Sequence, residues 1–167
     1  MILTRNEILK EINLKNIKIT PFAKKNIGPA SIDLTLDNEF RVFTNKKPVT
    51  LNENSDYKKY TKLLKKKSFL LMPNDYILAI TKERIKLPGN ICGFISGRTR
   101  FARFGISVYI AASFIQPCIN NKQVLEIKNV SSFPIILKSG LRICQLILER
   151  TEGSAIYVGK FKNQNNL

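Results

Sequence analysis

The chain has 167 residues, of which 44% are hydrophobic, and 28 Lys and Arg against 12 Asp and Glu give a formal net charge of +16. This length predicts one domain, residues 1–167, with a sizeable core, and no apolar run approaches the roughly 18 residues of a membrane-spanning helix. The absence of histidine excludes Ser-His-Asp and Cys-His nucleophile systems and the common histidine-containing zinc sites. The positive charge predicts an anionic partner, which could be nucleic acid, acidic lipid or a polyphosphate.

The N-terminal residues predict a short helix. They lack the basic region, apolar stretch and cleavage site of a signal peptide, so we expect a cytoplasmic protein. Thr4 and Glu7 have the spacing of a helix capping box, and apolar residues recur with helical spacing over 8–12. Pro21 lies in the loop that is expected to follow this helix.

Beyond residue 30, short apolar segments alternate with polar positions, which is typical of half-buried β-strands. Pairs such as Pro-Asn, Pro-Gly, Asn-Asn and Ser-Gly separate these segments. The strands are expected at residues 31–36, 40–43, 69–72, 76–80, 91–95, 106–110, 124–127, 133–137 and 142–148. This spacing predicts an all-β fold, a distorted jelly roll or barrel-like sheet, behind the N-terminal helix.

The polar and basic segment 44–67 is expected to be a long surface excursion. It contains the lysine-rich run from Lys58 to Lys67. We interpret this run as a solvated stretch outside the active site, and nucleic-acid binding is the alternative that we do not favour. At the other end of the chain, Asn163 to Leu167 are mostly polar and are expected to be mobile.

Residues 97–105, with the sequence Gly-Arg-Thr-Arg-Phe-Ala-Arg-Phe-Gly, interrupt the β-pattern. One or two helical turns would bury Phe101 and Phe104 and place Thr99 beside Arg103 on another face. Arginines and a hydroxyl at a glycine-led helix N-terminus are suited to binding an anion. The segment is therefore a candidate anion site, and an exposed basic helix is the alternative.

Among the acidic residues, Glu126 is the candidate for acid–base chemistry. It lies between Leu125 and Ile127 in a predicted strand, so its side chain faces away from both. If that face lines a pocket, burial and nearby arginines would tune the carboxyl group as an acid or a base. The alternative is a glutamate on the solvated side of a strand, and Asp33 is expected to be structural.

Five segments resemble, in order, the motifs of the dCTP deaminase family within the dCTP deaminase/dUTPase superfamily. The family motifs are a PASxDxxL strand, an LxPGxxxLAxT strand, a GRSSxARxG segment, a VLEF-type strand and a KYxxQ tail. Their counterparts here are residues 28–36, 71–81, 97–105, 124–127 and 159–164, which together span almost the whole chain. The resemblance implies a dUTPase-like jelly-roll subunit in a homotrimer, with active sites between subunits.

The resemblance also implies a reaction and its residues. The substrate would be dCTP, converted to dUTP and ammonia without zinc, and Mg²⁺ would be carried by the triphosphate, with no metal site on the protein. The catalytic residues would be Glu126 as proton shuttle, Arg103, Thr99 and Ala112, whose carbonyl would hold the attacking water. The substrate-binding residues would be Arg98, Thr99, Arg100, Tyr157, Lys160 and Gln164.

Two departures from the family pattern leave alternatives open. Thr99-Arg100 stands where the family has two serines, and Ile115-Gln116-Pro117 stands where it has Ile-Asp-Pro. A dUTPase, which converts dUTP to dUMP and pyrophosphate, uses that aspartate to activate water, and glutamine cannot act as a base. Deamination is therefore the first interpretation, and a dUTPase or a bifunctional enzyme is the second. A non-catalytic nucleotide- or nucleic-acid-binding paralogue is the third.

Overall fold

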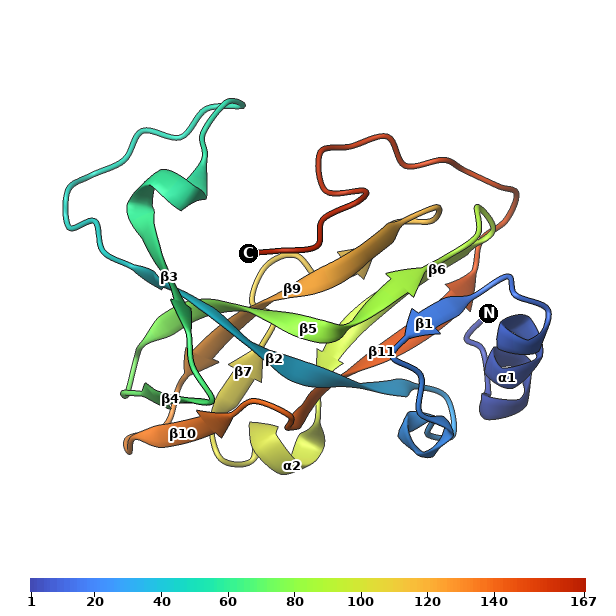
Figure 1. The fold of residues 1–167 in the computed structure, drawn as a ribbon, viewed down its shortest axis with the longest axis horizontal. Coiled ribbons are helices and arrows are strands. Elements are labelled where there is room, and N and C mark those ends of the chain that lie inside the picture. The colour runs from blue at the N-terminus through green and yellow to red at the C-terminus, as the bar shows by residue number, and fades with distance from the viewer.

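The computed structural model describes all residues, Met1–Leu167, and its centre is a strongly curled antiparallel sheet of nine strands (Figure 1). The strands are β1 (Lys18–Thr20), β2 (Ile32–Phe43), β3 (Thr61–Lys65), β4 (Ser68–Leu71), β5 (Tyr76–Lys86), β6 (Ile91–Gly97), β7 (Ile106–Val108), β8 (Phe114–Ile115), β9 (Asn120–Asn129), β10 (Ile135–Lys138) and β11 (Arg142–Arg150). The helices are α1 (Arg5–Asn13) and α2 (Thr99–Ala102), with 3₁₀ turns η1 (Lys24–Asn26) and η2 (Tyr57–Tyr60).

The main sheet has the strand order β7-β9-β5-β2-β11-β6-β8, with β1 added to β5 and β3 added to β2. A second sheet consists of β10 and β4 alone. This architecture confirms the predicted all-β fold with a short N-terminal helix. The short strands β1, β3 and β8 were not predicted, and two predicted segments, 31–36 and 40–43, are one continuous strand, β2.

A core of 28 buried residues fills the inside of the curled sheet. The helix α1 contributes Ile8 to this core, as its apolar stripe predicted. Thr4 occupies the N-cap position, but its side chain makes no capping hydrogen bond, so the predicted capping box is wrong. Glu7 instead binds Arg150 at 3.2 Å, and the same guanidinium group lies 2.7 Å from Glu11, which joins α1 to β11. No helix in the structure is both long enough and apolar enough to cross a membrane.

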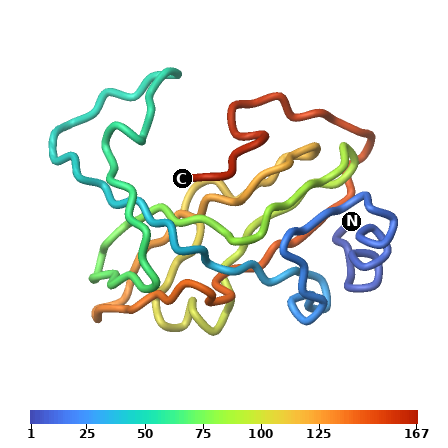
Figure 2. The backbone as a smooth tube through the Cα atoms, viewed as in Figure 1, coloured from blue at the N-terminus to red at the C-terminus, as the bar shows by residue number.

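Two irregular segments leave the sheet on the same side of the molecule (Figure 2). The excursion, residues 44–67, leaves β2 and returns through η2 and β3, and the tail, residues 151–167, crosses back over β9. Backbone N–H groups of Asn120 and Lys122 on β9 donate to tail carbonyls at 3.0 and 2.9 Å. Leu167 is only 2% exposed. The end of the tail, which was expected to be mobile, is therefore docked on the sheet.

Candidate active site

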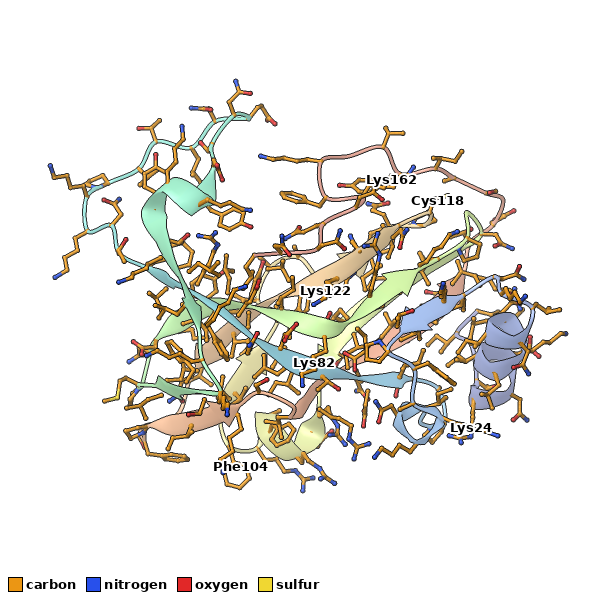
Figure 3. All side chains as sticks on the ribbon, in the orientation of Figure 1. Lys24, Lys82, Phe104, Cys118, Lys122 and Lys162 are labelled. Carbon is orange, nitrogen blue, oxygen red and sulfur yellow. The ribbon has the colours of Figure 1, made fainter.

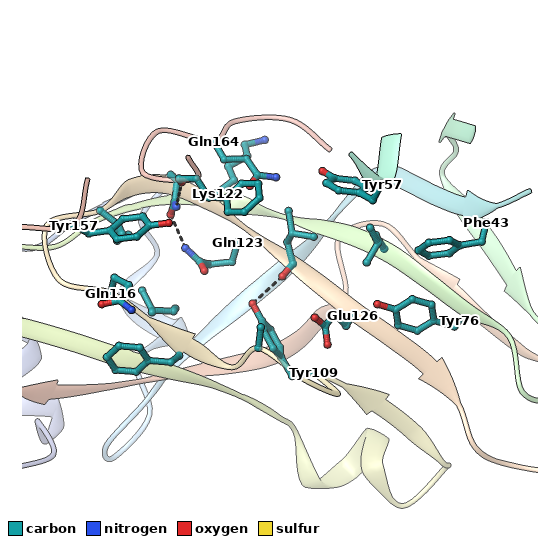
Figure 4. A pocket seen from close by; sticks show the side chains of 18 residues that line it. Phe43, Tyr57, Tyr76, Tyr109, Gln116, Lys122, Gln123, Glu126, Tyr157 and Gln164 are labelled. Carbon is teal, nitrogen blue, oxygen red and sulfur yellow. Dashed lines mark hydrogen bonds between the residues drawn. The ribbon is translucent and has the colours of Figure 1, made fainter. Parts of the chain in front are cut away.

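A cavity of about 410 Å³ lies beside β9, between the loop 109–119 and the tail (Figure 4). Aromatic rings, aliphatic side chains and amides make up most of its lining. Glu126 is the single carboxylate and Lys122 the single cation among the lining residues. A mostly apolar cavity with a few convergent polar groups is the usual form of a small-molecule site.

The carboxylate of Glu126 is held by the backbone of the loop that follows β7. Its Oε2 accepts hydrogen bonds from the N–H groups of Ile110 at 3.0 Å and Ala111 at 2.7 Å. The other oxygen, Oε1, has no hydrogen-bond partner in the protein. One oxygen therefore fixes the side chain in place, and the second remains free to exchange a proton with a bound molecule.

Tyr109 directs those two N–H groups toward the carboxylate. Its φ of 97° is rare for a bulky residue and turns the chain sharply just before Ile110. Two contacts keep it there: its N–H donates to the carbonyl of Glu126 at 2.8 Å, and its hydroxyl donates to the carbonyl of Val124 at 2.8 Å. Burial raises the pKa of the Tyr109 hydroxyl, so this group remains a donor. Backbone strain of this kind is concentrated at functional sites.

The only cation in the cavity lining is neutralised by a neighbour. Lys122 Nζ lies 2.8 Å from Asp37 on β2. Burial alone would raise the pKa of Asp37, but hydrogen bonds from Lys122 and from the Asn38 N–H lower it below its ordinary value. Because Lys122 and Asp37 neutralise each other, the carboxylate of Glu126 is the charged group of the cavity lining that has no ionic partner.

The tail closes one side of the cavity with two of the predicted substrate-binding residues. Tyr157 and Gln164 line it together with Phe161, whose carbonyl accepts a hydrogen bond from Asn121 at 2.7 Å. Lys160 does not line this cavity but lies on an adjacent polar one. Ala112, the predicted holder of the attacking water, also lines the Glu126 cavity.

The predicted anion segment forms the short helix α2 at the opposite edge of the molecule from the tail (Figure 1). Gly105 has a φ of +80° and lies in the turn that follows the helix. Phe101 is partly buried against the core, but Phe104 is 61% exposed, so the prediction that both rings are buried is wrong. The helix ends at Ala102, and Phe104 therefore lies in the following turn and points outward (Figure 3).

Beside α2, Asp33 holds two arginines. Its Oδ2 lies 3.1 Å from Arg98 Nη2 and 3.2 Å from Arg142 Nη1, and Arg98 also donates to the Arg142 carbonyl at 2.8 Å. Asp33 thus has a structural role in this chain. Thr99, Arg100 and Arg103 are exposed.

The structure therefore separates the predicted site residues into two groups, and Lys160 belongs to neither because it lies on the adjacent polar cavity. Those that line the Glu126 cavity are Glu126, Ala112, Tyr157 and Gln164. Those that lie at α2 and line no part of it are Arg98, Thr99, Arg100 and Arg103. Within one chain, Glu126 and these arginines are not brought together.

Sequence reasoning missed several residues of the cavity lining. Lys122 could have been predicted from the sequence, because it lies four residues before Glu126 and alternate residues of a strand share one face. Tyr76 and Tyr57 could not have been predicted, because they line the cavity only when segments that are distant in the sequence pack together. Burial raises the pKa of both tyrosines, with a smaller contribution from Glu126 at Tyr76.

Comparison with known proteins agrees with this arrangement. Residues 2–151 match the model of a family described as dCTP deaminase-like. A protein of Parafrankia sp. (strain EAN1pec) named "dCTP deaminase, dUMP-forming" is 32% identical, over 98% of this chain and 87% of its own. One of Mycolicibacterium vanbaalenii with the same name is 33% identical, over 93% of this chain and 83% of its own.

Solved structures show the same fold. The dCTP deaminase of Agrobacterium tumefaciens aligns with a TM-score of 0.70 at 16% identity, over 88% of this chain and 46% of that one, so this chain spans about half of its length. A dUTPase of Staphylococcus bacteriophage 80alpha aligns with a TM-score of 0.52 at 11% identity, over 86% of this chain and 88% of its own.

The curled sheet and its likeness to the solved structures define an all-β protein of the dUTPase-like fold. The match over residues 2–151 and the relatives above 30% identity are more specific. The chain belongs to the dCTP deaminase-like family, as its five motifs predicted.

Proposed function

We propose that this protein deaminates dCTP and carries the product on to dUMP. The observation that carries the proposal is the Glu126 carboxylate, the single acid of the cavity, with one oxygen fixed by two backbone N–H groups and the other free. The relatives named dUMP-forming support the second part of the reaction. The first interpretation from sequence had dUTP as the final product.

Deamination replaces the amino group at C4 of cytosine with oxygen. Glu126 would take a proton from water as the water oxygen bonds to C4 and would pass it to N3. It would then carry the proton of the new C4 hydroxyl group to the amine, which leaves as ammonia. The carbonyl of Ala112 would hold the attacking water. The step consumes dCTP and water and yields dUTP and ammonia, and a second water would then cleave dUTP to dUMP and pyrophosphate. Zinc has no part in this scheme, because the carboxylate itself transfers the protons.

The arginine group would complete this site from a neighbouring subunit of a homotrimer. In one chain, Arg103 and Thr99 are exposed on α2 and do not reach the Glu126 cavity. An arginine placed beside the reacting ring would stabilise the charge of the tetrahedral intermediate. Arg98 and Arg100 would contribute phosphate contacts from the same subunit.

The tail would supply the remaining substrate contacts. Tyr157 and Gln164 already line the cavity, and Lys160 lies beside it. We propose that Mg²⁺ enters bound to the triphosphate, as part of the substrate. Nowhere in the chain do three or more His, Cys, Asp or Glu side chains gather as a candidate metal site.

A second candidate function is deamination that ends at dUTP. Gln116 lines the cavity where a dUTPase would have its aspartate, and an amide cannot activate water. Glu126 would then be the only base available, and it would serve deamination alone. In this case Gln116→Asp should add pyrophosphate release that the natural chain lacks.

Measurement of both by-products separates these functions. Incubation with dCTP and Mg²⁺ should release ammonia and pyrophosphate in equal amounts if the product is dUMP. Ammonia without pyrophosphate would support the second candidate. Release of pyrophosphate from dUTP with no ammonia from dCTP would identify a dUTPase. Absence of both by-products would identify a non-catalytic paralogue. Either result would overturn the proposal.

A further inference from the structure

A second cavity, of about 420 Å³, lies between the excursion and the tail. Its lining is mainly polar: Lys58 from the excursion, Lys160 from the tail, and four amide side chains of the tail, Asn163, Gln164, Asn165 and Asn166. Tyr57, Phe161 and Gln164 line this polar cavity and the Glu126 cavity alike. The two cavities are therefore neighbours that share part of their lining.

A buried arginine holds the two sides of the polar cavity together. Arg41, on β2, donates to Thr61 Oγ1 of the excursion and to the carbonyl of Leu167 in the tail, both at 3.1 Å. Its guanidinium carbon also lies 5.9 Å from the centroid of the Tyr57 ring. Leu167 packs against Leu78 in a small apolar cluster behind these contacts. The excursion and the tail thus form one fixed unit.

The net charge of the polar cavity is positive, because its lining has two lysines and one carboxylate. Its one carboxylate, Asp56, is the N-cap of η2 and accepts a hydrogen bond from the backbone N–H of Lys58 at 3.1 Å. Neither Lys58 nor Lys160 forms an ion pair, in contrast to Lys65, which lies 2.9 Å from Glu39. Two free ammonium groups among amide donors are suited to a ligand with many acceptor oxygens, such as a polyphosphate.

We propose that the polar cavity binds the phosphate chain of the nucleotide and that Lys58 of the excursion is one of its phosphate ligands. This inference rests on the proposed function. A nucleoside triphosphate would place its base at Glu126 and extend its phosphates past Gln164 toward Lys58 and Lys160. Only the first lysine of the basic run would then belong to the site, whereas the sequence led us to place the whole run outside it.

The matched test compares Lys58→Gln with Lys59→Gln. The two lysines are adjacent in η2 and both are exposed, but Lys59 does not line the cavity. Loss of one charge-assisted phosphate contact should raise the KM for dCTP about tenfold in Lys58→Gln, with kcat within about twofold. Lys59→Gln should stay within about twofold of the natural protein in both. Equal KM values for the two variants would overturn the inference.

Binding of inorganic tripolyphosphate, measured by calorimetry, distinguishes this inference from the proposed function. The natural protein and Lys59→Gln should bind it equally, and Lys58→Gln about tenfold more weakly. If tripolyphosphate binding follows this pattern but the natural protein releases no ammonia from dCTP, the deaminase proposal is wrong and the phosphate subsite remains. Turnover of dCTP together with equal tripolyphosphate binding by all three proteins would leave the proposed function standing and show that the phosphates lie elsewhere.

Discussion

The Glu126 cavity and the arginine-rich end around α2 differ in what each offers a ligand. The cavity offers a space of about 410 Å³ and a fixed carboxylate, but its one cation, Lys122, is paired with Asp37. The α2 end has several arginines and a threonine at the surface, but no enclosed space that they line. Each region has what the other lacks, and the proposed function joins them by placing α2 of one subunit at the cavity of another.

The largest effect is expected at the carboxylate. Glu126→Gln keeps the shape and the two backbone hydrogen bonds but removes the proton acceptor. Ammonia release from dCTP should fall by about 10² to 10⁴-fold, the usual contribution of general acid–base catalysis, while nucleotide affinity changes far less. Glu149→Gln, at the far end of β11, is the matched control and should remain active. Near-normal turnover by Glu126→Gln would place the chemistry outside this cavity.

Mixed subunits test whether the two regions meet between chains. Glu126→Gln and Arg103→Ala should each be inactive alone, because each removes one half of every site. Assembled together, they should recover about a quarter of the natural activity, since random mixing joins an intact glutamate to an intact arginine at about one site in four. A mixture of Arg98→Ala and Arg103→Ala subunits changes the same region in both kinds of subunit and should show no activity beyond the average of the two variants alone.

The oligomeric state is a separate test of the shared site. Sedimentation of the natural protein should show a trimer at micromolar concentration. A monomer at that concentration, or mixed subunits that never recover activity, would mean that each chain uses its arginines and its carboxylate separately.

A smaller effect is expected from the residue that holds the arginines. Asp33→Asn keeps the size of the side chain but removes the counter-charge of Arg98 and Arg142, whose contacts with Asp33 are 3.1 and 3.2 Å. Thermal or denaturant unfolding should show a loss of about 1.5–3 kcal/mol, the usual worth of hydrogen bonds to charged groups. Glu126→Gln, whose carboxylate has no cationic partner, should lose less. The reverse order would contradict the structural role of Asp33.

The fold could be predicted from the sequence because most strands carry their own signal, although the short β1, β3 and β8 do not. Period-two alternation identified β9, and with it the direction of Glu126, since neighbours on a strand must face opposite sides. The docking of the tail carried no such signal. It depends on Arg41 and Leu167, which are 126 residues apart in the chain. No local pattern specifies a contact of that range.

Sequence motifs also could not predict how the site residues are distributed between subunits. A short motif identifies Arg98 or Glu126 by type and order, but it does not say whether the two side chains belong to one copy of the chain or to two. The structure shows the separation within one copy, which the sequence could not. It also places a lysine of the basic run, Lys58, on a cavity, because the fold of the excursion rather than its composition decides which lysine faces inward.

The smallest effect is expected in the rest of that run. Lys65, Lys66 and Lys67 lie at and just beyond the end of the edge strand β3, line neither cavity, and make one ion pair, from Lys65 to Glu39 at 2.9 Å. Exposed pairs of this kind contribute little and are screened by salt. Replacing all three by Gln should therefore change the KM for dCTP by no more than about twofold, against about tenfold for the single Lys58→Gln change.

If the triple variant has the larger effect, overall positive charge rather than position attracts the nucleotide. Tight, salt-sensitive binding of duplex DNA that is lost in the triple variant would instead assign this end of the excursion to a nucleic-acid partner.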